Sequence, residues 1–63
     1  MDGTNRDNIK LGSRVAVVKK EDQGSGNLTE GVVAEILTNS AFHPRGIKVR
    51  LESGEVGRVQ IIY

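Results

Sequence analysis

The segment from residue 38 to residue 46 holds the side chains with the clearest capacity for chemistry. Phe42, His43 and Arg45 fall within four positions of one another, with Pro44 between the last two. An exposed ring and an imidazole could stack on an unpaired nucleic-acid base while the guanidinium reaches a phosphate. A loop longer than the usual four to six residues also tends to be functional or disordered. The competing interpretation is structural, with Phe42 covering an open end of the fold and Pro44 stiffening the turn.

A second group of polar side chains follows that loop at alternating positions, namely Lys48, Arg50, Arg58 and Gln60. If they lie on neighbouring strands, they share one outer surface. The three cations among them would then neutralise two or three phosphates in weak, salt-sensitive binding. The alternative is a solvated face whose potential is reduced by nearby Glu52 and Glu55. The chain has a net charge of +1, but residues 43–63 carry +2 and residues 1–42 carry −1. The predicted nucleic-acid-binding residues are therefore Phe42, His43, Arg45, Lys48, Arg50, Arg58 and Gln60.

Metal binding and catalysis find little support in the sequence. His43 is the only histidine and there is no cysteine, so a metal site would need carboxylates gathered from separate turns. Ser40 lies near His43, but neither a strained nucleophile turn nor a water-excluding pocket is expected in so small a fold. The glycine-bearing stretch 21–27 begins with two acids and precedes no helix, unlike a phosphate cradle, and it is interpreted as a flexible hairpin tip. We expect no catalytic residue, metal or cofactor.

The length and composition indicate a single small domain. A chain of 63 residues buries only roughly 60% of the surface that its unfolded form exposes. No apolar run approaches the roughly 20 residues of a membrane span, and residues 1–8 lack the apolar segment of a signal peptide. We therefore expect a loose tail over residues 1–8, one domain over residues 9–63 and no membrane association. The absence of cysteine fits a cytoplasmic location.

The apolar pattern favours strands over helices. No 3.6-residue periodicity persists, helix caps are absent, and glycine recurs at short intervals. Runs rich in Val and Ile, bounded by glycine and polar residues, predict four strands. Their ranges are 14–19, 28–37, 47–51 and 56–62.

The register of the last two strands can be deduced from the turn between them. Ser53 and Gly54 suit a two-residue hairpin turn, because glycine accepts the positive φ that such turns require. One extra residue at Gly57, a β-bulge, is then needed to keep the apolar side chains on one face. The resulting pairs are Val49 with Val59, Ile47 with Ile61, Arg50 with Arg58, and Lys48 with Gln60. The like-charge pair of Arg50 with Arg58 lowers the stability of the fold. Its presence therefore favours a function that involves an anionic partner.

Short strands, tight turns and no helix leave few architectures. A sheet of this size must curl to bury its apolar face and cover its edges. Because oligonucleotide-binding folds usually need a longer chain, we predict an all-β, small SH3-like barrel of four to five antiparallel strands.

Two resemblances support this prediction. Residues 12–17 (GSRVAV) and 31–36 (GVVAEI) resemble the KOW motif of ribosomal proteins and NusG-like transcription factors. Residues 20–23, 26–31, 37–51 and 57–60 resemble the YwbE-like family of small bacterial proteins, and this second likeness covers nearly the whole chain. That family has no established function, so it transfers no functional residue.

The sequence thus predicts a non-catalytic binding module. The first hypothesis is weak binding to RNA or a ribonucleoprotein such as the ribosome, through the basic face and the 38–46 loop. The alternative is a protein-interaction module in which a sheet edge or the barrel groove takes a peptide strand. The clustered cations favour nucleic acid, and the scarcity of aromatic residues argues against a groove for proline-rich peptides. The sequence does not determine the oligomeric state.

Overall fold

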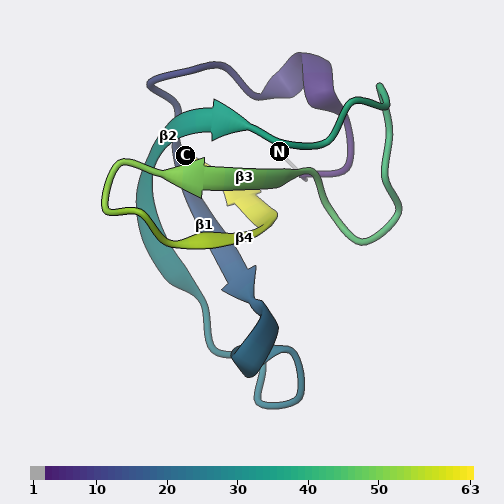
Figure 1. Ribbon diagram of the computed structural model, residues 1–63. Coiled ribbons are helices and arrows are strands. Elements are labelled where there is room, and N and C mark those ends of the chain that lie inside the picture. The colour runs from purple at the N-terminus through teal and green to yellow at the C-terminus, as the bar shows by residue number, and fades with distance from the viewer. Residues whose placement is uncertain (1–2) are drawn as a thin grey trace.

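The computed structural model describes residues 3–63, which form a closed barrel of four antiparallel strands (Figure 1). The strands pair in the order β1, β2, β3, β4, and β4 returns to pair with β1. Two single-turn 3-10 helices, η1 and η2, flank β1. The predicted all-β fold is confirmed, and the closed barrel is consistent with a small SH3-like barrel. The elements are η1 (Arg6–Asn8), β1 (Arg14–Lys19), η2 (Lys20–Asp22), β2 (Thr29–Ile36), β3 (Lys48–Leu51) and β4 (Val56–Ile62).

The core lies inside the barrel and consists of aliphatic side chains. Alternate residues of a strand point to opposite faces, so β-branched residues at every second position fill the interior. In β3, for example, Val49 and Leu51 are buried while Lys48 and Arg50 are exposed. The core residues, each at most 3% exposed, are Ile9, Val15, Val17, Val33, Ile47, Val49, Leu51 and Val59.

Two β-bulges allow the short strands to bend into a barrel. The register of β2 against β3 shifts between Val33 and Glu35, and the register of β4 against β1 shifts between Val59 and Ile61. At each shift two consecutive residues are exposed instead of one. Such bulges bend a strand and increase its twist, which helps a small sheet to close.

The hairpin between β3 and β4 differs from the sequence expectation. Gly54 N donates to Leu51 O at 2.8 Å, and Leu51 N donates to Glu55 O at 2.8 Å. These bonds enclose a three-residue loop in which Gly54 has φ 94°, the arrangement of a type I turn followed by a left-handed glycine. The predicted two-residue turn and the predicted bulge at Gly57 are wrong, because the extra residue is located in the turn.

The pairing of the basic side chains changes accordingly. Lys48 lies opposite Arg58, Arg50 opposite Val56, and Val49 opposite Gly57. The predicted pairs of Arg50 with Arg58, Lys48 with Gln60, Val49 with Val59 and Ile47 with Ile61 are therefore wrong. Residues 58–60 nevertheless keep their expected faces, with Val59 buried between the outward-facing Arg58 and Gln60. A like-charge cross-strand pair exists, but it joins Lys48 and Arg58.

The segment over residues 3–8 packs against the loop at residues 38–46 rather than lying apart as a tail. The first two residues of the expected tail lie outside the described residues. Gly3 is buried beside Val59, and η1 lies next to the loop (Figure 1). Three backbone hydrogen bonds join residues 3–6 to residues 41–47: Arg6 N to Ala41 O (2.8 Å), His43 N to Thr4 O (2.9 Å) and Ile47 N to Gly3 O (2.7 Å).

Candidate functional site

A two-part groove lies beside β4. It consists of two adjoining hollows of about 500 Å³ and about 510 Å³, which share Val18, Gln23 and Arg58. We call the whole the Arg58 groove. The first part, the Leu28 hollow, adds Gly26, Leu28, Arg45 and Gln60. The second part, the Lys48 hollow, adds Lys20, Glu21, Lys48, Val56 and Gly57.

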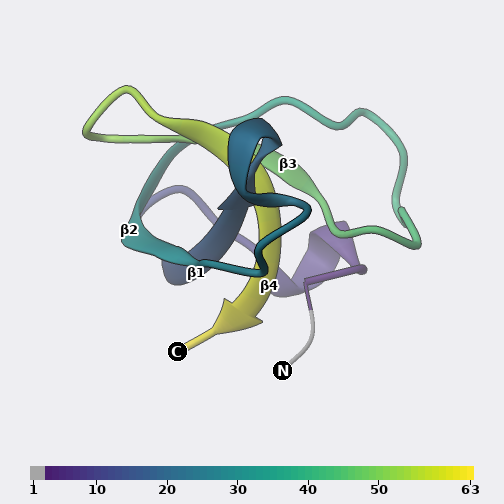
Figure 2. The same ribbon diagram turned by 90° about the horizontal axis from the view of Figure 1, so that it is seen from below.

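Closure of the barrel between β1 and β4 forms the floor of this groove. Val17 faces the core, so the next residue, Val18, faces outward and pairs with Arg58. Gly57 allows the two strands to approach, since a Cβ at this position would lie 2.7 Å from the Val18 carbonyl oxygen. The hairpin segment 20–28 forms one wall. It projects beyond the barrel in Figure 1 and lies in front of β4 in Figure 2.

Arg58 occupies the junction between the two hollows and is held in place by the loop. Its Nη1 donates to Gly46 O at 3.2 Å, and the residue is partly buried. Gly46 has φ 103°, and a side chain there would collide with the Val59 carbonyl, so this position requires glycine. A guanidinium has five N–H donors, which leaves several for a ligand. Within residues 3–63, Arg58, Arg45 and Lys48 form no ion pair with a carboxylate.

Gln60 connects the loop to β4. Its Nε2 donates to Arg45 O at 3.0 Å, and it lies 3.3 Å from the carbonyl oxygens of both Arg58 and Val59. Carbonyl oxygens only accept hydrogen bonds, so the amide nitrogen must face them. The Oε1 atom of Gln60 then points away, and no hydrogen bond to it occurs within the part of the chain that the structure describes.

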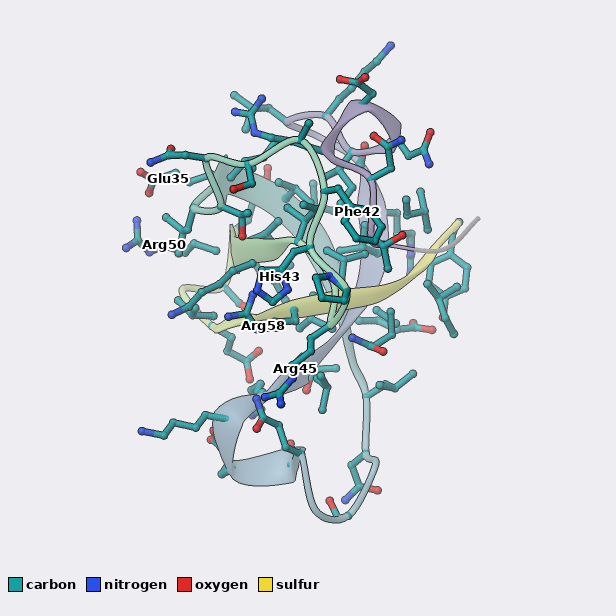
Figure 3. All side chains as sticks on the ribbon, turned by 90° about the vertical axis from the view of Figure 1, so that its right-hand side faces the viewer. Glu35, Phe42, His43, Arg45, Arg50 and Arg58 are labelled. Carbon is teal, nitrogen blue, oxygen red and sulfur yellow. The ribbon has the colours of Figure 1, made fainter. Side chains whose placement is uncertain are left out.

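Two arginines outside the groove, Arg50 and Arg14, lie beside carboxylates. Arg50 pairs with Glu35, which lies directly opposite on β2 at the bulge. Figure 3 shows these two side chains together at one side of the molecule, away from Arg45. Arg14 lies 4.0 Å from Glu30 at the other end of β1. Arg50 therefore shares the outward-facing side of β3 with Lys48 but lines neither hollow.

Lys19 and Glu55 form a further ion pair outside the groove. Lys19 Nζ lies 2.9 Å from Glu55 Oε2, and the lysine side chain is only 23% exposed. The hydrogen bond from Lys19, supplemented by one from Ser53, lowers the pKa of Glu55 below its ordinary value. The same bond to Glu55 raises the pKa of Lys19. Glu55 thus compensates Lys19 and is not available to reduce the charge of Arg58.

Phe42 and His43 lie outside the groove. Phe42 is 59% exposed and forms an isolated bridge with Asn5, so its ring is not a core side chain. His43 Nδ1 accepts a hydrogen bond from Arg45 N at 3.2 Å, which helps to shape the loop. Figure 3 shows Phe42, His43 and Arg45 following one another along the loop. Of the seven sequence candidates, the groove brings together Arg45, Lys48, Arg58 and Gln60.

The wall contributed by the 20–28 hairpin was not predicted from the sequence, in which residues 21–27 were interpreted as a flexible tip. Val18 and Leu28 line the Leu28 hollow, and Lys20 lines the Lys48 hollow. A signal was present in the consecutive Val17 and Val18, because one of two adjacent strand residues must face outward. No local sequence pattern indicated that Leu28 would line the same hollow as Arg58.

Among residues 3–63, no three His, Asp or Glu side chains are arranged to hold a metal ion. In the same residues, none of the helices has the length and apolar character needed to cross a membrane.

The fold and the groove together define a small, closed, four-stranded barrel with a cationic surface groove. Comparison with known proteins adds the family. The chain belongs to the family described as "Uncharacterized conserved protein (DUF2196)", whose model matches residues 2–62. It is 55% identical over 62 residues to the "Uncharacterized protein YwbE" of Bacillus subtilis (strain 168). The matched stretch covers 98% of this chain and 95% of that protein. The resemblance to YwbE-like proteins is thus confirmed. No solved structure matches the chain significantly.

Proposed function

We propose that this protein is a non-catalytic RNA-binding module that uses the Arg58 groove. The observation that carries the proposal is the gathering of Arg45, Lys48 and Arg58 around one groove without carboxylate partners among the described residues. Unpaired cations lining a concave surface attract phosphates and release counterions when they bind them. A cytoplasmic location fits this role and rests on the absence of cysteine.

The charges of the groove favour an anionic partner. Four cations line it, namely Lys20, Arg45, Lys48 and Arg58, against the single carboxylate of Glu21. Lys48 and Arg58 are direct cross-strand neighbours, and like charges in that position are destabilising. A phosphate between them would relieve the repulsion.

Binding of a peptide strand is less well supported. Addition of a strand needs a free sheet edge. Within residues 3–63 each of the four strands already pairs with two neighbours, so the barrel offers no complete free edge. A peptide would have to bind through side chains alone.

The test is a titration with an unstructured RNA dodecamer, followed by fluorescence anisotropy and amide chemical shifts. If three cations each contact a phosphate, the logarithm of the affinity should fall with the logarithm of salt with a slope of about −2.1, because each contact on a single strand contributes about −0.7. A fourfold rise in salt should then weaken binding by about 18-fold. Shifts should concentrate on residues 45–48 and 58–60.

Charge-matched variants identify the surface. Arg45→Ala and Lys48→Ala should each reduce the steepness of the salt dependence by about 0.7. Arg14→Ala also removes one positive charge, but Arg14 lies near Glu30 at the end of β1 that is far from the groove. This variant should therefore change the affinity for RNA little. Equal losses for Arg14→Ala and Arg45→Ala would show that the groove is not the binding surface. Absence of measurable RNA binding at low salt would reject the function.

A further inference from the structure

The two hollows of the Arg58 groove differ in chemical character. The Leu28 hollow has aliphatic walls from Val18 and Leu28, and Leu28 remains 43% exposed. Arg45 and Arg58 line the same hollow. The Lys48 hollow is more polar, with Lys20, Lys48 and the carboxylate of Glu21 beside Arg58. Both compartments are thus cationic, the Leu28 hollow is the more apolar one, and Arg58 belongs to both.

This division matches the two halves of a nucleotide. Phosphates need cations, whereas an unpaired base is held by contacts to its faces and by hydrogen bonds to its edge. Guanidinium planes are among the groups on which bases stack. The Oε1 atom of Gln60, turned away from the three carbonyls that hold Nε2, is an acceptor for an N–H donor on a base edge. An exposed leucine contributes nothing to a site that binds phosphates alone.

A double-stranded RNA cannot make the base contacts that the Leu28 hollow offers. In double-stranded RNA the base faces are stacked and the Watson–Crick edges are paired, so proteins reach mainly phosphates and 2′-hydroxyls. A hollow of about 500 Å³ can contain a base only if that base is free to leave the stack. We propose that the Arg58 groove selects single-stranded RNA, with one unpaired base in the Leu28 hollow and the adjoining phosphates in the Lys48 hollow. This inference rests on the proposed RNA binding.

Three ligands of matched charge separate the inference from the function on which it rests. They are a single-stranded dodecamer, a duplex half as long that carries about the same number of phosphates, and an inorganic polyphosphate chain of equal charge. We expect the single strand to bind at least about fivefold more tightly than either of the others, since a contact of about 1 kcal/mol corresponds to that ratio. Equal affinities for all three would overturn the base hollow and leave charge-driven RNA binding intact. Failure of all three to bind would remove the proposed function itself.

Two measurements at Leu28 locate the base. Leu28→Asn should weaken binding of the single strand by about fivefold, because covering the exposed part of one leucine contributes only a fraction of its full burial. The same variant should bind polyphosphate as the unchanged protein does, whereas Lys48→Gln should weaken both ligands. In the unchanged protein, a stacked base should shift the Leu28 methyl resonances upfield, and polyphosphate should not. Leu28 methyl resonances that respond alike to both ligands would contradict the placement.

Discussion

Replacing Gly57 by alanine tests the closure of the barrel on which the groove depends. Gly57 lies in β4 between Val49 on β3 and Lys19 on β1, in a regular ladder without a bulge. A Cβ added there would lie 2.7 Å from Val18 O, 2.8 Å from Val17 Cγ2 and 3.0 Å from Val17 Cβ. Since the nearest of these atoms belongs to the backbone, rotating a side chain cannot relieve the clash, and β1 and β4 must separate.

The expected cost follows from two opposing effects. Inserting a methyl group into a packed interior costs about 1 to 3 kcal/mol, and contact with a backbone carbonyl favours the upper part of that range. Alanine returns about 0.5 to 1 kcal/mol, because glycine loses more conformational freedom on folding. We therefore expect Gly57→Ala to lower the free energy of unfolding by about 2 kcal/mol. With a urea m-value of about 1 kcal/mol/M for so small a domain, the midpoint should fall by about 2 M.

Two other glycines calibrate the measurement. A Cβ at Gly24 would meet no atom within 4 Å, so Gly24→Ala should be neutral or stabilise by about 0.5 kcal/mol. A Cβ at Gly31 would lie 2.7 Å from Leu51 Cδ1, the movable end of a side chain, so Gly31→Ala should fall between the two. Urea unfolding followed by circular dichroism ranks the three variants. A urea midpoint for Gly57→Ala equal to that of Gly24→Ala would refute the close approach of β1 and β4 at Gly57. The register predicted from the sequence, with a bulge at Gly57, would then have to be considered again.

Two further predictions concern the stability of the barrel. The pKa of Glu55 is lowered in the folded state, so its pairing with Lys19 stabilises the fold at neutral pH and is lost as the pH falls through that pKa. The difference in urea midpoint between the unchanged protein and Glu55→Gln should therefore shrink from about pH 7 to about pH 3, and a constant difference would contradict this account. Deleting residues 1–8 removes three backbone hydrogen bonds to the segment 41–47 and should cost about 3 kcal/mol. The amides of His43 and Ile47 should exchange faster in any folded fraction, and an unchanged melting temperature would show that the segment contributes nothing.

The strands were predictable because the information that defines them is local. Residues 14–19 and 56–62 have the expected bounds, the third strand begins one residue later than expected, and the second is one residue shorter at each end. Alternation in β3 also predicted that Lys48 and Arg50 face outward. The register was not predictable from alternation, since one extra residue at Gly54 or at Gly57 leaves residues 58–60 on the same faces. Turn geometry decides between the two positions.

The groove was only half predictable for a related reason. Lys48, Arg58 and Gln60 lie on two consecutive strands, so their common face follows from the hairpin. Val18 and Leu28 reach that face through the pairing of β1 with β4, which joins the two ends of the chain. No local pattern indicates which side chains such a closure brings together.

The total charge of +1 gives little indication of the field in the groove, because the fold distributes the carboxylates unevenly. Glu35 is paired with Arg50 and Glu30 lies close to Arg14, both outside the groove. Lys19 lies 2.9 Å from Glu55 and 3.9 Å from Glu21, so it also offsets the one carboxylate that lines the Lys48 hollow. Removing Lys19 would therefore weaken anion binding even though the residue does not line the groove. A nearly neutral chain can in this way present a locally positive groove, because Glu30, Glu35 and Glu55 lie in ion pairs outside it.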